Sequence, residues 1–567
     1  MKGIIASPGR AYADAFIVQE PRIVVEKTSI DDSDNELERL QSAIDACDVQ
    51  FESLIKGLDA DDDTATIELL EFQQMMLEDT DYLDKITTII TEDKLNAEYA
   101  VEVASNDYIG FLQNLTDNDY LRERAADIGD MAQRLLGALL GISRAIEEPD
   151  HDYIAIANDI TPSRMAELDQ DKLKGIALEK GSLTSHCSIL AASLGIPCLI
   201  EVTGLLEADT TGKRILLDAE HGELVLDPSK QQIDAYLDYR KAREQDLEAL
   251  KAYVDKESRT LDGAHMGVYA NIISASEVAS LLEQGGEGVG LLRTELIYME
   301  ETTAAPSEEK QFQLYSEIAS ALDGLPLIIR TLDVGGDKDI DYLHIGKEDN
   351  PFLGYRAIRY SLDTPEVFKA QIKAIVRASA QGNVEMMFPL ITTIDEIRRA
   401  KALVSEVFNE LDKGNVAYNK DMKIGIMIET PASAFDSARM AREVDFFSIG
   451  TNDLAQYLFA ADRTNAKVLE LNSYFQPTLL RTMAQVADSA HEAGIMVDIC
   501  GRAGEVLELI PLWIAMGIDN VSVSIPEITR VRRKITQTDK AASVKLLDKV
   551  LQCDTAGEVQ AMLGGAS

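Results

Sequence analysis

The sequence lacks long apolar runs, and its cysteines and histidines lack regular spacing. No run approaches the ~18 consecutive apolar residues that a membrane-spanning helix needs. The first residues, interrupted by Pro8, Arg10 and Asp14, do not resemble a secretion signal. The five cysteines and six histidines fit neither a disulfide framework nor a zinc site. We therefore expect a cytoplasmic protein without a membrane anchor.

Positive charge is also scarce. The 567 residues include 54 Lys+Arg against 98 Asp+Glu, a net charge of −44. Nucleic-acid binding needs clustered Lys and Arg, so this acidity argues against a nucleic-acid partner. Hydrophobic residues make up 46% of the chain, enough to build cores, which excludes wholesale disorder. The length predicts roughly three or four domains, or fewer if one is a large barrel.

Nearly half of the net negative charge lies in residues 30–142. This segment holds 28 Asp+Glu against 7 Lys+Arg, contains no proline and repeats its apolar residues at helical spacing. We predict an all-helical subdomain here. Its charge has two interpretations: a solvated surface, or a docking face for a basic protein whose encounter rate electrostatics would raise.

The flanking segments predict an α/β domain, into which the acidic helices are inserted. Short strand-like runs occur at 153–157, 175–178, 198–200 and 215–218, and the segments between them have a helical pattern. The predicted organisation is an α/β domain of residues 1–29 and 143–228, the helical insertion 30–142, a linker helix 229–259 and a C-terminal domain 260–567.

The C-terminal domain predicts a (β/α)8 barrel. Eight apolar strand-like runs alternate with mostly helical text, at 268–270, 288–292, 327–329, 384–388, 424–428, 446–449, 495–499 and 521–523. Polar or reactive residues follow several of these runs directly: Arg293, Arg330, Glu429, Asn452 with Asp453, and Cys500. Because such barrels carry their chemistry at the C-terminal ends of the strands, this placement supports both the fold and a site.

Four arginines fall at these strand ends or in neighbouring loops, namely Arg293, Arg330, Arg356 and Arg463. The guanidinium fork matches the oxygen pairs of carboxylates and phosphates, so their convergence suits a small substrate that carries both groups. Pairing of the arginines with nearby carboxylates is the alternative.

Glu429 and Asp453 offer two hard oxygen ligands suited to Mg²⁺. A general acid/base pair, or salt bridges to the arginines, are the other interpretations of these two carboxylates.

Two further side chains are candidates for covalent or proton chemistry. Cys500 is the only cysteine at a strand end, where its thiol could exchange a proton with a substrate carbon; the alternative is a buried structural cysteine. His186 stands in the predicted first turn of a helix capped by Thr184 or Ser185, where the helix favours an anion. Its imidazole could carry a phosphoryl group, or it could be an ordinary solvated residue. No nucleotide-binding loop with a Gly-Lys-Ser/Thr ending occurs.

Several motifs together resemble the phosphoenolpyruvate-utilising enzymes, and in particular the enzyme I branch of the phosphoenolpyruvate:sugar phosphotransferase system. They run along the whole chain and read MKGIIASPG, YLRERAADIGD, GEGVGLLRTE, RTLDVGGDK, NPFLGYRAIR, MFP, ETPAS and DFFSIGTNDLAQY. The last agrees with the barrel signature of the family at every defined position and is highly specific.

The resemblance implies a role for each candidate residue. His186 would accept the phosphoryl group of phosphoenolpyruvate and pass it to a histidine of the carrier HPr, as the first step of sugar uptake. Arg293, Arg330, Asn452 and Arg463 would bind phosphoenolpyruvate, while Lys338 and Arg356 would position its phosphate. Glu429 and Asp453 would hold Mg²⁺, and Cys500 would protonate the enolate that becomes pyruvate. The resemblance also implies HPr docking on the helical insertion, a homodimer through the barrel, and a swivel of the domain that carries His186.

The sequence departs from the family pattern around both reacting groups. Ser182 replaces a glycine, Cys187 follows His186, and Ala192 stands where an arginine is usual; after Cys500, Arg502 stands where a glutamate is common. These changes leave open a specialised relative that binds phosphoenolpyruvate or a carrier as a regulator. An ATP-dependent relative that phosphorylates pyruvate is disfavoured, because the sequence has no recognisable nucleotide-binding module.

The acidic insertion gives a testable expectation. If residues 30–142 steer a basic carrier, added salt should slow phosphoryl transfer to that carrier, because salt screens exposed charges beyond about 10 Å at 0.1 M. The measurement is the transfer rate against ionic strength. A flat response would favour the solvated-surface interpretation.

Overall fold

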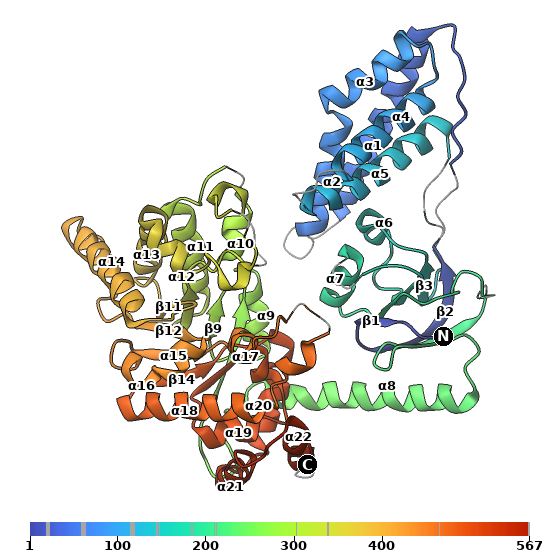
Figure 1. The fold of residues 1–567 in the computed structure, drawn as a ribbon. Coiled ribbons are helices and arrows are strands. Elements are labelled where there is room, and N and C mark those ends of the chain that lie inside the picture. Colours follow the sequence, from blue (N-terminus) through green and yellow to red (C-terminus); the bar gives the residue numbers. More distant parts are fainter. Residues whose placement is uncertain are drawn as a thin grey trace. The chain divides into compact units, whose positions relative to one another are not determined.

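The computed structural model divides the chain into two compact units, Met1–Arg243 and Glu244–Ser567. It describes the chain except for residues 19–22, 58–63, 114–118, 143–145, 147, 183–184, 209, 211, 302, 337–339, 347, 464, 466 and 565–567. No helix in this described part has both the length and the apolar character needed to cross a membrane. Each unit is considered by itself below (Figure 1).

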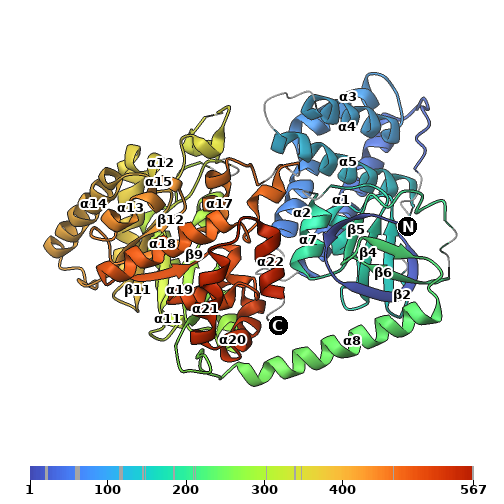
Figure 2. The same ribbon diagram turned by 60° about the horizontal axis from the view of Figure 1, so that its bottom comes forward.

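The first unit contains a seven-stranded mixed sheet of order β1-β5-β4-β3-β2-β6-β7 (Figure 2). The strand bounds are β1 Ile4–Ser7, β2 Arg10–Ile17, β3 Tyr153–Ala157, β4 Leu173–Leu178, β5 Cys198–Ile200, β6 Arg214–Asp218 and β7 Glu223–Val225. The strands β2, β3, β4 and β5 pair in parallel, and the edges are antiparallel. All five β3 residues are buried, as expected for a central parallel strand covered on both faces.

Five helices follow one another between β2 and β3, which confirms the predicted helical insertion into an α/β fold. They are α1 Ser33–Gly57, α2 Thr64–Leu77, α3 Thr80–Thr91, α4 Ala97–Gln113 and α5 Asp119–Leu140. Their shared apolar core includes Phe51, Leu70, Ile86 and Leu135. The apolar repeat in the sequence is thus the inner face of a helical bundle, which leaves most of the described carboxylates on the outer faces; Glu36, Glu98, Asp127 and Asp130 are buried.

A buried ionic junction joins this bundle to the sheet domain. Arg134 of α5 and Arg164 of α6 (Pro162–Ala166) each lie 2.6 Å from a different carboxylate oxygen of Glu167. Their side chains are only 4% and 3% exposed. Beside them the Ser163 hydroxyl donates to Asp130 of α5. Burial of two guanidinium groups is tolerated only where a carboxylate compensates them, so Glu167 fixes this junction.

The long helix α8 (Lys230–Leu250) follows the sheet, and its first half is fastened to the sheet by aromatic and polar contacts. The Tyr236 ring meets Tyr12 edge-on at 5.9 Å, and the guanidinium of Arg10 lies 4.6 Å from the centre of the Tyr239 ring. The Tyr239 hydroxyl donates to Glu220 at 2.6 Å. These contacts tie one face of an otherwise polar helix to the β2 and β6–β7 strands.

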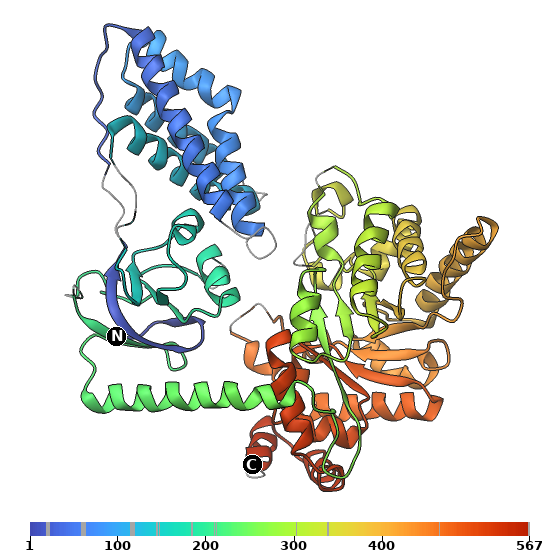
Figure 3. The same cartoon turned by 180° about the vertical axis from the view of Figure 1, so that it is seen from behind.

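The second unit is a closed barrel of eight strands, each paired in parallel with its neighbours (Figure 3). This confirms the predicted (β/α)8 fold, and each predicted run overlaps one strand. The bounds are β8 Gly267–Ile272, β9 Val289–Leu292, β10 Leu327–Arg330, β11 Val384–Phe388, β12 Ile424–Ile428, β13 Phe446–Ile449, β14 Met496–Ile499 and β15 Asn520–Val523.

Helices surround the barrel, and their apolar faces pack on the outward-facing side chains of the strands. The α-helices are α9 Glu277–Glu283, α10 Glu295–Met299, α11 Glu308–Ala321, α12 Ile358–Asp363, α13 Pro365–Ala378, α14 Ile394–Lys413, α15 Pro431–Phe435, α16 Ser437–Met440, α17 Thr451–Phe459, α18 Pro477–Ala493, α19 Ile510–Met516, α20 Ile528–Thr536, α21 Lys540–Val550 and α22 Ala556–Gly564. A second, smaller apolar cluster includes Ile328, Met387 and Phe446, which come from the alternate, inward-facing strand positions, and Cys500, which directly follows β14.

The ionic junction predicts a localised loss of stability. Glu167→Gln removes the carboxylate charge that Arg134 and Arg164 share, so the contact between α5 and α6 should weaken by about 3 kcal/mol. Hydrogen exchange should quicken in both helices. Glu52→Gln is the matched control, because Glu52 makes an exposed ion pair with Lys56. Equal, small effects of the two variants would contradict a stabilising role for Glu167.

Candidate functional site

The candidate residues of the barrel gather at the C-terminal ends of its strands. Arg293 directly follows β9, Arg330 ends β10, Glu429 directly follows β12 and Cys500 directly follows β14. Asn452 and Asp453 lie in the first turn of α17, after β13. Closure of the barrel therefore brings together side chains that are up to about 200 residues apart in the sequence.

Asp333 is the carboxylate that two of the predicted arginines share. Arg330 Nη1 lies 3.1 Å from Asp333 Oδ2, and Arg356 Nη2 lies 2.9 Å from Asp333 Oδ1. Arg330 also meets Glu295 at 2.8 Å. Burial acts to lower the pKa values of both guanidinium groups, but the neighbouring carboxylates outweigh it and raise them. Both arginines are therefore fully charged and held rigidly in a buried network.

Glu429 and Asp453 form a buried carboxylate pair within reach of these arginines. Asp453 Oδ1 lies 3.6 Å from both Arg356 Nη1 and Arg463 Nη1. Glu429 is fully buried, and one of its oxygens accepts a hydrogen bond from the Leu390 amide at 2.6 Å. Burial, and next the charge of Asp453, raise the pKa of Glu429 to about 8.

This pair fits a divalent cation. Glu429 Oε2 and Asp453 Oδ1 are buried oxygens that find no hydrogen-bond partner in the described part of the chain. Carboxylate oxygens are the ligands that Mg²⁺ prefers, usually one or two from the protein with the rest from water and substrate. A cation at this point would also relieve the repulsion that raises the pKa of Glu429.

Two glycines allow the loops to approach this pair closely. A side chain at Gly450 would come within 2.6 Å of Glu429 Oε2, and one at Gly501 would collide with the Thr451 hydroxyl. Asn452 lies between these loops: its side-chain oxygen accepts from the Tyr474 hydroxyl at 2.7 Å and from the Arg502 amide at 3.2 Å. The Asn452 carboxamide is thus held in one orientation.

Cys500 is buried at this mouth, and its thiol is protonated at neutral pH. Burial is the main factor that raises its pKa, to about 12, with Arg330 and Arg293 acting in the opposite direction. The thiol lies 3.7 Å from the Ile449 carbonyl oxygen. A thiol with this pKa is a poor nucleophile but can donate a proton to a developing carbanion.

His186 lies in the first unit, where it is the first residue of α7 (His186–Ser193). Ser185 caps this helix: its side-chain oxygen accepts from the Ser188 amide at 3.3 Å, which agrees with the predicted cap. The imidazole itself lies outside the described side chains. Cys187, the next residue, is buried in the apolar core of the domain.

Several residues of the site were not predicted from the sequence, and the predicted residue Lys338 lies outside the described part of the chain. Glu295 and Asp333, which hold the arginines, stand two and three residues after Arg293 and Arg330 in motifs already noted. Tyr474, which orients Asn452, has no such signal in the sequence.

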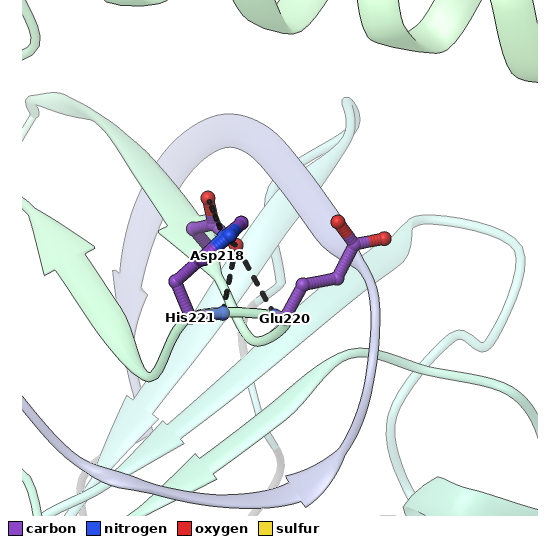
Figure 4. Close-up of side chains that lie close together, drawn as sticks. All are labelled: Asp218, Glu220 and His221. Carbon is purple, nitrogen blue, oxygen red and sulfur yellow. Dashed lines mark hydrogen bonds and ion pairs between the residues drawn. The ribbon is translucent and has the colours of Figure 1, made fainter. Parts of the chain in front are cut away.

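A second group with metal-type spacing lies in the first unit, on the turn that joins β6 to β7 (Figure 4). Asp218 accepts from the amides of Glu220 and His221 and lies 3.1 Å from the His221 ring. Arg10 Nε lies 3.3 Å from Asp218 and 2.9 Å from Glu220. A guanidinium thus neutralises this cluster, which is better explained as the anchor of Tyr239 and α8.

One more buried carboxyl lies deeper in the barrel. Asp498 precedes Cys500 by two residues on β14, and its Oδ1 accepts from Asn520 at 2.8 Å. Burial is the main factor that raises its pKa, from 3.8 to about 8, with Asp519 and Glu385 adding to the shift. At neutral pH this carboxyl is therefore largely protonated.

Comparison with known protein families assigns the class. The PEP-binding domain of PEP-utilising enzymes matches residues 247–540, their N-terminal domain residues 2–124, and their mobile domain residues 149–222. All eight barrel strands, and His186 with the first six strands of the sheet domain, fall within these matches. The chain therefore belongs to the family of phosphoenolpyruvate-utilising enzymes.

Within that family the chain is similar to one kind of enzyme along its whole length. It is 38% identical to the phosphoenolpyruvate-protein phosphotransferase of Priestia megaterium, over 99% of this chain and 97% of that protein. It is 36% identical to the protein of the same name from Bacillus subtilis (strain 168), over 99% of each chain. The solution structure of an Enzyme I protein (nEIt) aligns at 23% identity with a TM-score of 0.39, over 43% of this chain and 99% of that one.

Asp498 predicts an unusual pH dependence of stability. Between about pH 4 and about pH 8 the folded chain keeps a proton that the unfolded chain releases, so this group lowers stability as pH rises, by at most about 1.4 kcal/mol per unit. Asp498→Asn removes the effect. Its gain in melting temperature over the parent should therefore grow from pH 5 to pH 8.

The control for this prediction is Asp412→Asn. Asp412 is an exposed carboxylate whose pKa its partner Lys420 lowers, so its removal should give no such trend over this range. A gain from Asp498→Asn that does not change with pH would contradict a protonated buried carboxyl.

Proposed function

We propose that this chain is a phosphoenolpyruvate-protein phosphotransferase that moves the phosphoryl group of phosphoenolpyruvate to its own His186 and then to a histidine of an HPr-like carrier. The barrel mouth supports this proposal most directly, because Arg330, Arg356 and Arg463 lie around two buried carboxylate oxygens that have no hydrogen-bond partner among the described residues. The full-length similarity to enzymes of that name supports the same conclusion.

Different residues of the barrel mouth are proposed to bind different groups of the substrate. Phosphoenolpyruvate is bound by Arg293, Arg330, Asn452 and Arg463, and Arg356 positions its phosphate. Lys338 is assigned to the phosphate with Arg356 only because of the family resemblance. Glu429 and Asp453 hold Mg²⁺, which supplies positive charge to the phosphate oxygens when it is bound. The rigid network through Asp333 keeps the guanidinium groups in place before substrate arrives, so little ordering is needed on binding.

The transfer forms one bond as it breaks another. The neutral imidazole of His186 attacks the phosphorus, a P–N bond forms, and the bond to the enol oxygen breaks. The electron pair left on the enolate takes a proton from the Cys500 thiol at the methylene carbon, which yields pyruvate. Because its pKa is about 12, the thiol holds that proton until the carbanion develops. A histidine of the carrier then displaces the phosphoryl group from His186.

The proposal also covers domain motion, partners and location. The imidazole of His186 has to enter the barrel mouth and leave it again, so we propose that the domain that carries His186 swivels. The helical insertion, acidic and built as a bundle, is the proposed docking site of the basic carrier. We further propose a homodimer through the barrel and cytoplasmic action as the first step of sugar uptake.

A second candidate function is a regulator that binds phosphoenolpyruvate or the carrier with little turnover. The changed surroundings of His186 favour it: Ser182, the buried Cys187, and Ala192 in place of an arginine. Such a protein would keep the barrel mouth but would not accumulate phosphohistidine.

Labelling with phosphoenolpyruvate tests the proposed function. In the presence of Mg²⁺, labelled phosphoenolpyruvate should leave one acid-labile label per chain, and His186→Ala should abolish it. His221→Ala is the matched control and should keep the label, because His221 is engaged with Asp218. Absence of label in the parent chain, or label that survives His186→Ala, would favour the regulator.

Cys500→Ser should separate chemistry from binding. A serine hydroxyl is a weaker acid than the thiol, so pyruvate formation should slow by on the order of 10²-fold or more, while phosphoenolpyruvate binding should change less than about twofold. Cys553→Ser, a buried cysteine on the C-terminal side of α21, should leave both unchanged. Equal losses of rate and affinity in Cys500→Ser would remove the thiol from the proton step.

A further inference from the structure

Phe352 lies near the barrel mouth in a short turn whose backbone is held from two sides. It is the middle residue of the 3-10 helix η3 (Pro351–Leu353). The Tyr457 hydroxyl of α17 donates to the Phe352 carbonyl oxygen. The Arg359 guanidinium donates to the carbonyl oxygen of Leu353 at 3.0 Å. These hydrogen bonds fix the point from which the Phe352 side chain extends.

The Phe352 ring faces two guanidinium groups of the barrel mouth. The guanidinium carbons of Arg356 and Arg463 lie 5.8 and 5.5 Å from the centre of the ring. Both distances fall within the ~6 Å over which an aromatic face attracts a cation. Among the described residues the half-buried Phe352 ring is a member of none of the apolar clusters, whereas Tyr355 packs against one. Attraction to the cations therefore explains this ring better than core packing does.

The carboxylate of Asp453 holds these two arginines only loosely. Its Oδ1 lies 3.6 Å from both Arg356 Nη1 and Arg463 Nη1, which is too long for a hydrogen bond. Asp453 is also a proposed ligand of Mg²⁺, and a divalent cation there would repel both guanidinium groups. An aromatic face attracts a cation without occupying a metal ligand, so the Phe352 ring can retain the arginines when the metal is bound.

We propose that Phe352 is a positioning residue, whose ring holds the guanidinium groups of Arg356 and Arg463 in place for the substrate. The inference rests on the proposed function, because that function assigns both arginines to phosphoenolpyruvate. Phe352 acts through these arginines and touches no reacting atom. Loss of the aromatic face should therefore weaken substrate binding and leave the chemical step nearly unchanged.

Ring variants of Phe352 test the proposal by direct binding. Phosphoenolpyruvate is titrated calorimetrically, with Mg²⁺, into the full chain carrying His186→Ala, so that no phosphoryl transfer follows binding. Phe352→Leu keeps an apolar side chain but removes the aromatic face, and should weaken binding about tenfold. With His186 restored, the same variant should raise the KM for phosphoenolpyruvate about tenfold at nearly unchanged kcat.

Fluorinated rings separate attraction to the cations from packing. Mono-, di- and trifluorophenylalanine placed at position 352 nearly keep the shape of the ring, but each fluorine withdraws negative charge from its face. The affinity for phosphoenolpyruvate should therefore fall stepwise with the number of fluorines. A ring that only packs would give no such series, and this comparison does not depend on how well Phe352→Leu folds.

Phe312→Leu is the matched control. The guanidinium carbon of Arg377 lies 3.8 Å from the centre of the Phe312 ring, in a similar pair between the outer helices α11 and α13. This variant should keep the phosphoenolpyruvate affinity of the parent.

Three results would overturn the inference: an affinity that ignores the fluorine series, equal losses of affinity in Phe312→Leu and Phe352→Leu, or a chain that binds no phosphoenolpyruvate. Failure of the proposed function has a different signature. Phosphoenolpyruvate would still bind and its affinity would still follow the fluorine series, but no label would reach His186 in the parent chain.

Discussion

The barrel mouth depends on compensation of buried charge, and Asp333 is its centre. One carboxylate faces two guanidinium groups, Arg330 and Arg356, at about 3 Å. Without it these cations would be buried against each other at a cost of several kcal/mol. In the same way Glu295 compensates the charge of Arg330, and Asp453 compensates the charge of Arg356. The positions of the groups proposed to bind phosphate therefore follow from the pairing of opposite charges inside the protein.

The fold was largely predictable because a closed parallel barrel requires eight apolar strand segments that alternate with helices along the sequence. Each strand is an apolar run, and the residue that follows it faces the mouth, so Arg293, Glu429 and Cys500 could be picked out by position alone. The closed eight-stranded order and the helical insertion confirm these expectations. Helix-capping residues predicted the place of His186 at a helix start, because Ser185 and Gly195 mark the two ends of a short apolar segment.

The sequence could not single out the carboxylates that hold the site together. Glu295 and Asp333 are two of 98 acidic residues, and their importance comes from burial beside arginines, which a linear pattern does not record. Tyr474 reaches Asn452 from a loop 22 residues further along the chain, a contact without any periodic signal. The positions of the barrel strands along the chain, in contrast, follow from local sequence.

The single tryptophan of the chain has a practical consequence. Trp513 of α19 is fully buried, and its indole N–H donates to the Ala503 carbonyl oxygen at 3.1 Å, inside the 3-10 turn η5 (Arg502–Glu505) that follows Cys500. The emission of one indole, sensitive to the polarity and hydrogen bonding of its surroundings, therefore reports on that turn without background from any other tryptophan. If occupation of the mouth shifts that turn, the intrinsic fluorescence of the unmodified protein reports the shift in real time and without a dye.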